Sequence, residues 1–349
     1  MSSGALLLTL SRGLGGGIER YVETLEWSFA EQGIDCGRID LRCAGAAAHA
    51  QLFAEARDRL RARVAPTRLV LGHRALLPVA SLLARDRTVS GISVVCHGSD
   101  VWGAHVRPRW WVEDRLMRRR DVRVIAVSSF TAGALSRGFP AAVLPPGLSR
   151  GWFDTLVKAS TTAQRRRHGV HLVTAFRLAD WQNKGLPELM GAVAALGRSD
   201  IHLTVCGTGE PPASLRRLVE GRRCCTLRPG LSDDELAGQL AAADLFVLAT
   251  RTRPGRNASG EGFGLVLLEA QVAGTPVVGP AYGGSHDAYL DQVTGVAPTD
   301  ESERALAGTL DDLLQCPARL SQMGKRAAEW ASESFAPERY APLAVARLL

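Results

Sequence analysis

Short apolar runs that alternate with helical segments constrain the fold of this chain more than any other feature. Most runs are continuously apolar rather than alternating, which is typical of strands covered on both faces. The expected strands are Ala5–Leu10, Leu69–Leu71, Ile92–Cys96, Val122–Val127, Leu172–Phe176, Leu203–Cys206, Leu245–Leu248 and Pro276–Val278. The helical segments include Ile18–Glu31, Leu186–Leu196, Asp233–Ala242 and Phe263–Val272. This alternation predicts an α/β chain with doubly wound parallel sheets.

The strand and helix pattern occurs twice along the 349 residues. One series ends near Leu144 and a second opens at His171, with a polar stretch between them that lacks periodicity. We therefore expect one domain over 1–158, a linker over 159–169 and a second domain over 170–335. The helical end, with breaks at Pro337 and Pro342, is expected to return to the first domain through 336–349. Two such domains direct their strand ends to a shared cleft, where a ligand is expected.

Composition narrows the class of protein further. No apolar run approaches 18 residues, and the start has no basic leader, so neither a membrane-spanning helix nor a signal peptide is predicted. The seven cysteines form no C-x-x-C pair, which favours buried free thiols in a reducing, cytoplasmic compartment. The net charge of +7 suits an anionic ligand, a membrane surface or a nucleic acid. Only three of the 42 basic residues are lysines, which indicates a GC-rich genome.

A glycine-rich turn follows the first strand, at Arg12–Arg20. Such a turn lets backbone N–H groups approach a phosphate at a helix N-terminus. The spacing fits neither G-x-G-x-x-G nor a Walker motif, so a plain tight turn is the alternative. Gly16 and Gly17 are the candidate contact residues.

The segment Glu261–Val278 carries the strongest chemical signal. Glycines lead into an apolar helix that holds Glu269, a carboxylate that is costly to bury without a partner. With Glu261 ahead of the helix, the two acids flank a helix N-terminus that favours phosphate, and a carboxylate can accept two hydrogen bonds from a vicinal diol. The candidate donor-binding residues here are Gly262, Phe263, Gly264, Leu265 and Glu269.

Two cations follow the first strand of the second series. Arg177 closes the strand, and Lys184 precedes Gly185 and a new helix. An arginine and a lysine can stabilise a leaving diphosphate without a metal ion. The chain has no D-x-D sequence, so we expect neither a metal site nor another cofactor.

In the first series, His97 and Asp100 follow the strand Ile92–Cys96. Their place at the carboxyl end of a strand turns them toward the cleft, where they are expected to contact substrate hydroxyls. Further on, the basic and aromatic stretch Arg107–Arg120 leaves several interpretations open. It is either a partly buried helix with a solvated basic face, a contact with an anionic membrane, or the border of an acceptor pocket. No nucleic-acid motif accompanies it.

Taken in order along the chain, these residues resemble the family-4 retaining glycosyltransferases, which have the GT-B fold of two Rossmann-like domains. The features that carry the resemblance are Gly16-Gly17-Ile18-Glu19-Arg20, His97, Ser128-Ser129-Phe130, Arg177 with Lys184-Gly185, Gly207-Thr208-Gly209, Ala243-Asp244-Leu245-Phe246-Val247, Glu261-x7-Glu269, Gly274-Thr275-Pro276-Val277-Val278, Gly283-Gly284 and Phe335-x3-Arg339. They cover almost the whole chain in the family's order.

The resemblance implies roles for these residues. Glu269 would bind the ribose hydroxyls of a nucleotide sugar, and Glu261 would lie beside the transferred sugar. Arg177 and Lys184 would neutralise the diphosphate, and His97 would contact the sugar in the closed cleft. Gly16 and Gly17 would let the turn of the acceptor-side first domain approach the phosphate. Such enzymes retain the anomeric configuration, need no metal, and are thought to transfer the sugar from the front face.

Two stretches depart from the family pattern. Gly283-Gly284 is followed by Ser285-His286-Asp287 in place of Pro-Glu, and Pro146-Gly147 stands where Asn-Gly is frequent. The run Ser285-His286-Asp287 is no catalytic triad, because consecutive residues cannot orient one another.

The sequence thus predicts a retaining glycosyltransferase that moves a hexose from a nucleotide diphosphate, UDP above others, to a hydroxyl. The expected acceptor is a small molecule, such as an aminocyclitol of antibiotic biosynthesis, or a lipid-linked compound. The alternatives are a sugar-nucleotide epimerase on the same fold, a non-catalytic GT-B binding module, and a basic protein that binds nucleic acid or membrane. Closure of the cleft would exclude water and favour transfer over hydrolysis.

Overall fold

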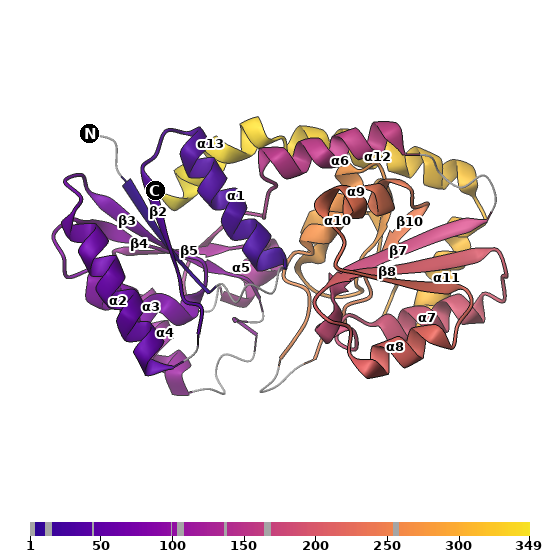
Figure 1. Ribbon diagram of the computed structural model, residues 1–349, viewed down its shortest axis with the longest axis horizontal. Helices are drawn as coiled ribbons and strands as arrows, with labels where there is room; N and C mark the ends of the chain where they lie inside the picture. Colours follow the sequence, from indigo (N-terminus) through magenta and orange to yellow (C-terminus); the bar gives the residue numbers. More distant parts are fainter. Residues whose placement is uncertain are drawn as a thin grey trace.

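The computed structural model divides the chain into two lobes of similar design that lie side by side (Figure 1). It describes residues 4–10, 16–43, 45–98, 100–102, 108–135, 138–163, 169–253 and 258–349. Each lobe is built on one six-stranded sheet in which every neighbouring pair is parallel. The two sheets confirm the predicted doubly wound α/β class.

The first lobe has the strand order β2-β1-β3-β4-β5-β6. Its strands are β1 (Gly4–Thr9), β2 (Cys36–Asp40), β3 (Thr67–Leu71), β4 (Val89–Cys96), β5 (Val122–Ala126) and β6 (Ala141–Val143). Its helices are α1 (Gly17–Glu31), α2 (Ala46–Arg61), η1 (Arg74–Leu76), α3 (Leu77–Leu83), α4 (Pro108–Met117) and α5 (Ser129–Leu135). The order of the strands reverses between β1 and β3, so the crevice of this sheet lies where these two strands end.

The second lobe has the order β12-β11-β10-β7-β8-β9. Its strands are β7 (Val170–Arg177), β8 (Ile201–Thr208), β9 (Cys225–Pro229), β10 (Leu245–Val247), β11 (Val277–Val278) and β12 (Gly295–Val296). Its helices are η3 (Leu178–Asp180), α7 (Leu186–Ala195), α8 (Ala213–Glu220), α9 (Asp233–Ala241), α10 (Leu265–Val272), η4 (Gly284–Ala288) and α11 (Glu303–Leu314). Here the order reverses between β7 and β10, which sets the crevice at Arg177 and the residues after Val247.

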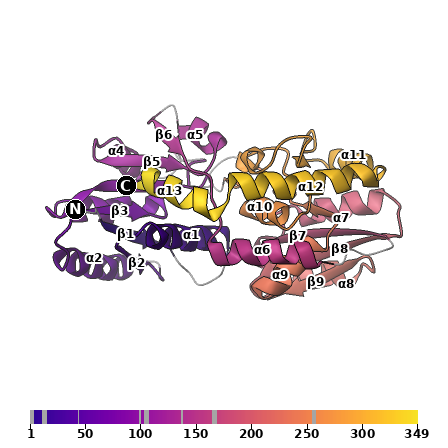
Figure 2. The same ribbon diagram turned by 90° about the horizontal axis from the view of Figure 1, so that it is seen from above.

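Two helical connections cross between the lobes. After β6 the chain enters α6 (Arg150–Thr162), which packs on α9 and α10, and after α12 (Pro317–Ser334) it returns through α13 (Pro337–Leu348), which packs on α1. Figure 2 shows α6 running alongside α12, while α13 continues to the first lobe, where the C-terminus lies. The hydroxyl of Ser93 in β4 donates to the carbonyl of Leu348.

These connections differ from the expected boundaries in two respects. The boundary at 158 cuts through α6, because Ser160–Thr162 continue this helix, and residues 164–168 of the expected linker lie outside the described residues. Pro342 does not break α13. It lies on the exposed side of the helix, where the carbonyl that loses its partner can face water.

One apolar core joins the lobes. It combines residues of β1 and α1 with residues of β7, β10 and α10, and it passes through both crossings at Leu148, Trp152, Phe335 and Tyr340. A second cluster fills the outer side of the first lobe and a third the outer side of the second. The shared core fixes the strand ends of the two sheets opposite each other.

The cysteines are all free thiols, as expected, but they are not all buried. Cys96 and Cys206 are buried, and Cys36 and Cys225 are partly buried. Cys43, Cys224 and Cys316 are exposed. Within the described residues, no helix is both long enough and apolar enough to span a membrane.

Candidate active site

The glycine turn of the first lobe lies directly against the second lobe. A Cβ atom added at Gly16 would come within 3.0 Å of Nη2 of Arg177, and one at Gly17 would lie 4.0 Å from Cβ of Leu265. A side chain at Gly16 would therefore push on the Arg177 guanidinium. The structure thus brings Gly16 and Gly17 close to two candidate donor-binding residues, while residues 11–15 of the turn lie outside the described residues.

Lys184 and Glu261 form an ion pair at the strand ends of the second lobe. Nζ of Lys184 lies 2.8 Å from Oε2 of Glu261, and the hydroxyl of Thr250 donates to the same oxygen at 2.9 Å. The backbone holds Lys184 in place through Gly185, which has a φ of 67° and no room for a side chain beside the Ala249 carbonyl. Thr250, which the sequence analysis missed, thus fixes the Glu261 carboxylate.

Arg177 is the more exposed of the two cations. It ends β7, and its Nη1 lies 3.8 Å from Oδ2 of Asp180. An exposed ion pair at this length is weak, so the guanidinium can reorient toward an anion at little cost.

The helix α10 begins two residues later than the sequence indicated. Gly264, with a φ of 80°, precedes its first residue, Leu265. Phe263 lies in the core, with its ring centroid 6.3 Å from that of Phe335, so its expected contact with a donor is limited to the backbone. A Cβ at Gly262 would overlap the carbonyl of His97, which shows that this loop touches the first lobe.

Glu269 is buried, with 4% of its surface exposed, and it has partners from two other helices. Nε1 of Trp152 donates to Oε1 at 2.9 Å, and Nε of Arg20 lies 3.8 Å from the same oxygen. Burial raises the pKa of Glu269, while the charge of Arg20 and the Trp152 hydrogen bond act in the opposite direction. A carboxylate in this apolar helix was expected to need a partner, and Trp152 and Arg20 are its partners.

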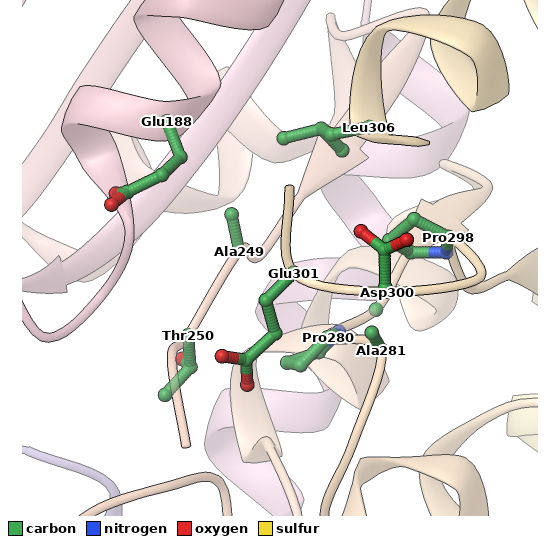
Figure 3. A pocket seen from close by; sticks show the side chains of 10 residues that line it. Glu188, Ala249, Thr250, Pro280, Ala281, Pro298, Asp300, Glu301 and Leu306 are labelled. Atoms are coloured by element: carbon green, nitrogen blue, oxygen red, sulfur yellow. The ribbon is translucent and has the colours of Figure 1, made fainter. Parts of the chain in front are cut away.

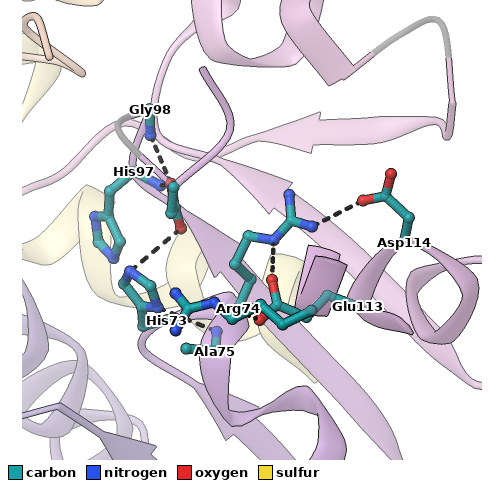
Figure 4. Close-up of polar contacts among 9 residues, drawn as sticks. His73, Arg74, Ala75, His97, Gly98, Glu113 and Asp114 are labelled. Atoms are coloured by element: carbon teal, nitrogen blue, oxygen red, sulfur yellow. Dashed lines mark hydrogen bonds and ion pairs between the residues drawn. The ribbon is translucent and has the colours of Figure 1, made fainter. Parts of the chain in front are cut away.

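His97 and Gly98 lie in the turn after β4 (Figure 4), and Asp100 is hydrogen-bonded to both of them. Oδ1 of Asp100 accepts the backbone N–H groups of His97 and Gly98 at 2.8 and 2.9 Å. Nε2 of His97 lies 2.8 Å from the carbonyl oxygen of Gly72, so this nitrogen carries the proton. Asp100 therefore shapes the turn, a role that the expected substrate contact did not include.

His73 joins this cluster from the end of β3, at the crevice of the first sheet. Its Nδ1 accepts the N–H of Ala75, which leaves the proton on Nε2, 3.9 Å from the buried Oδ2 of Asp100. Burial lowers the pKa of both His73 and His97, so both rings are neutral near pH 7. The reversal of strand order at β3 is the signal that would have found His73.

Where it is described, the stretch Arg107–Arg120 forms a helix with one buried side, at Trp110, Glu113 and Met117, and an exposed basic side. Arg74 is buried and pairs with Glu113 and Asp114 of α4 at 2.8 and 2.7 Å (Figure 4). Its guanidinium lies over the Trp110 ring. The next residue, Trp111, is 72% exposed. Arg107 lies outside the described residues.

Asp287 makes a second polar contact between the lobes. Its Oδ2 accepts the backbone N–H of Ser129 at 2.5 Å and its Oδ1 accepts the Ser129 hydroxyl at 2.6 Å, at the start of α5. The neighbouring Ser285 hydroxyl is buried without a partner, and His286 faces the Pro280 carbonyl. These separate partners agree with the argument that this run is no triad.

A small pocket lies at the carboxyl ends of β10 and β11, where Ala249, Thr250, Pro280 and Ala281 line it (Figure 3). Its polar wall contains Thr250, Glu188, Asp300 and Glu301. Arg251 closes the wall by bonding Glu188 at 2.7 Å. Thr250 lines the pocket and donates to Glu261, so it connects the pocket to the ion pair. Within the described residues no group of three metal-ligating side chains converges.

Comparison with solved structures identifies the fold of the chain. The chain superposes on HepE from Anabaena, solved with UDP and glucose, with a TM-score of 0.74, 16% identity and coverage of 99% of this chain and 98% of that one. For sucrose-phosphate synthase from Thermosynechococcus elongatus the TM-score is 0.76, with 19% identity and coverage of 97% of each chain. The two lobes therefore have the GT-B fold.

Sequence comparisons then define the family. The model of the group 1 glycosyl transferases matches residues 174–330. The GDP-mannose-dependent α-(1-6)-phosphatidylinositol monomannoside mannosyltransferase of Mycolicibacterium smegmatis is 30% identical over 276 residues, which cover 75% of this chain and 71% of that protein. The D-inositol 3-phosphate glycosyltransferase of Pseudarthrobacter chlorophenolicus is 33% identical over 247 residues, covering 62% of this chain and 56% of the other.

The chain belongs to the group 1 glycosyl transferases. It is a glycosyltransferase, which moves a sugar from a nucleotide sugar to an acceptor. The predicted class of enzyme is thereby confirmed.

Proposed function

We propose that this enzyme transfers a hexose from a nucleoside diphosphate to an acceptor hydroxyl, with retention of the anomeric configuration and without a metal ion. The observation that carries the proposal is the approach of Gly16 to Arg177 across the lobes. A bare backbone opposite a guanidinium is a place where a diphosphate meets donors from both sides.

The donor would be held mainly by the second lobe. Arg177 and Lys184 would bind the diphosphate, and the start of α10, from Gly262 to Leu265, would offer backbone N–H groups. Glu269 would accept the ribose hydroxyls, for which an ionised carboxylate has two suitable oxygens. Lys184 would exchange part of its contact with Glu261, 2.8 Å away, for the phosphate.

The reaction would depend on charge held in place before the bond breaks. As the bond between the sugar and the phosphate opens, Arg177 and Lys184 would stabilise the negative diphosphate. The acceptor oxygen would bond to the anomeric carbon on the same face, and its proton would pass to the departing phosphate oxygen. His97 and Glu261 would contact the hydroxyls of the sugar and orient it.

Uridine is the base that we expect, with guanosine as the second candidate. HepE was solved with UDP and glucose, which supports the first, and the mannosyltransferase relatives named GDP-mannose-dependent favour the second. The backbone from Leu227 to Gly230, at the end of β9, would read the base.

The acceptor that we favour carries a cyclitol ring. The relatives named for D-inositol 3-phosphate and for phosphatidylinositol mannoside support this class, in a small or a lipid-linked form. An aminocyclitol of antibiotic biosynthesis fits the same description. We expect the reaction in the cytoplasm, where free thiols such as the seven here persist.

The test is a product analysis with two donors and two acceptors. The enzyme is incubated with UDP-glucose or GDP-mannose, and with D-inositol 3-phosphate or phosphatidylinositol vesicles, in buffer containing EDTA. We expect a product in which NMR shows the same anomeric configuration as the donor. An inverted product, or activity that EDTA abolishes, would contradict the proposal. Incubation with UDP-GlcNAc alone exposes an epimerase through a new sugar nucleotide.

A further inference from the structure

Arg20 is a first-lobe residue whose side-chain partners lie beyond its own lobe. It stands in the first turns of α1, and its Nη2 lies 2.5 Å from Oδ1 of Asp233 in α9. Its Nε lies 3.8 Å from Oε1 of Glu269 in α10. Its guanidinium carbon lies 4.4 Å from the centre of the Trp152 ring in α6. One arginine thus spans the cleft and meets three helices.

The three partners of Arg20, which are Asp233, Glu269 and Trp152, stand on helices that pack against one another. The helix α6 packs on both α9 and α10, so Trp152 lies against the second lobe. Its indole uses two different surfaces, because the N–H donates to Glu269 at 2.9 Å while the ring face receives the Arg20 cation. Trp152 therefore contacts both the Arg20 cation of the first lobe and the Glu269 carboxylate of the second lobe.

Glu269 has a physical need for this cation. It is 4% exposed in a helix whose other buried side chains are apolar apart from Gln271. A buried carboxylate without a positive partner tends to take up a proton, and a protonated carboxyl group has fewer acceptor sites for a diol. Of the charged groups that act on Glu269, Arg20 favours the ionised form and Asp233 disfavours it. Trp152 adds a neutral hydrogen bond from α6.

We propose, on the basis of the function proposed above, that Arg20 is a positioning residue for the donor site. It reaches from the first lobe to hold the Glu269 carboxylate ionised and oriented for the ribose hydroxyls. Because the cation and the carboxylate belong to different lobes, the ribose site is complete only when the lobes are together. Donor binding and lobe closure are then coupled, and by linkage each favours the other by the same factor.

The proposal is tested by calorimetric titration of UDP, GDP and pyrophosphate into the full-length enzyme and its variants. Arg20→Met keeps the length of the side chain and removes the charge. We expect about tenfold weaker binding of the nucleotide that the wild type binds. Pyrophosphate, which has no ribose, is expected to bind the wild type and Arg20→Met equally. A matching loss for pyrophosphate would overturn the proposal, because Arg20 would then act on phosphate.

A comparison with a second contact between the lobes separates an effect on Glu269 from a general loss of contact between the lobes. Asp287→Asn weakens a different polar contact between the lobes, that of Asp287 with Ser129 at 2.5–2.6 Å, and does not touch Glu269. We expect this variant to lack the upward shift in the pH midpoint of nucleotide binding that Arg20→Met produces. An equal shift in both variants would contradict the inference. Melting curves establish that each variant is folded.

A double-mutant cycle identifies the residue through which Arg20 acts. In the Glu269→Gln background, Arg20→Met is expected to change nucleotide affinity less than twofold, because the carboxylate it serves is gone. Additive losses would overturn the proposal. A wild-type enzyme that binds neither UDP nor GDP defeats the proposed function itself, whereas normal binding by Arg20→Met defeats this inference alone.

Discussion

The two lobes share an architecture but treat charge differently where their strands end. In the first lobe the groups at the crevice are neutral or already engaged, since His73 and His97 have lowered pKa values and Asp100 holds the backbone of its own turn. In the second lobe, Lys184 and Glu261 form a partly exposed pair. In the proposed function, the charged crevice of the second lobe would hold the diphosphate and the neutral crevice of the first lobe would contact hydroxyls.

The largest effect on the difference between the two lobes is expected from a substitution of Glu269. Glu269→Ala removes the carboxylate and should weaken nucleotide binding by at least about 100-fold, since two charge-assisted hydrogen bonds of roughly 1.5–3 kcal/mol each are lost. Calorimetry with UDP and GDP measures the change, with Glu333→Gln on the exposed side of α12 as control. Unchanged affinity would end the assignment of the ribose site.

A slightly smaller effect is expected at Lys184. Lys184→Met should lower kcat by about 100-fold, because one preorganised cation for the departing diphosphate is missing. Steady-state rates with a saturating donor test this. Lys158→Met, at an exposed position of α6, is the matched control. If both variants kept full activity, the second lobe would not supply the charge for catalysis.

In the first lobe, substitution of Asp100 is expected to change the stability of the protein rather than its affinity for the donor. Asp100→Ala leaves the N–H groups of His97 and Gly98 without their acceptor and should lower the free energy of unfolding by roughly 1–3 kcal/mol. Urea denaturation measures the loss. Donor affinity should stay within twofold of the wild type. A large loss of donor affinity in a fully stable variant would erase the difference between the lobes.

The pH dependence of donor binding should come from the second lobe. Protonation of Glu269 removes an acceptor, so affinity for the nucleotide is full above its raised pKa and falls as the pH drops through it. The fall approaches about tenfold per pH unit below that point. Titrations across the acidic range check this. Affinity that rises on acidification would contradict an ionised Glu269.

The smallest effect is expected at the surface of α4. Trp111→Ala should change the free energy of unfolding by less than about 0.5 kcal/mol, because the ring is 72% exposed. Trp110→Ala should cost about 3–5 kcal/mol, since that ring is buried beneath Arg74. Urea denaturation of the pair tests the contrast. Sedimentation with anionic vesicles shows whether Trp111 serves a membrane instead.

The central strands of both sheets were predictable from the sequence, and the edge strands were not. Each strand expected from an apolar run is present. The four that were missed, β2, β6, β9 and β12, are the edges of the two sheets. An edge strand is covered less, so sequences such as Cys36–Asp40 and Cys225–Pro229 need no continuous apolar run.

The site shows the same limit. Candidates that stand in a local motif, such as Glu261 and Lys184, could be proposed from the sequence because the motif is continuous or short. Arg20 stood in a quoted motif without a role, and Trp152 in none. Both contact Glu269, which is more than 100 positions away from Trp152 in the chain. Only the packing of α1 and α6 on α10 brings such residues together.

The paired crossings have a mechanical consequence for the enzyme. A single covalent link would let one lobe swivel freely about the other, whereas two links side by side act as a spine. Gly147 in the first crossing lies so close to the Tyr340 ring in the second that a Cβ there would come within 2.5 Å of it. We expect the two links to restrict any opening of the lobes to a bend along their common direction. Such a bend would return Arg20 and Gly16 to the same position against the second lobe at each closure, so that every donor would meet the same geometry.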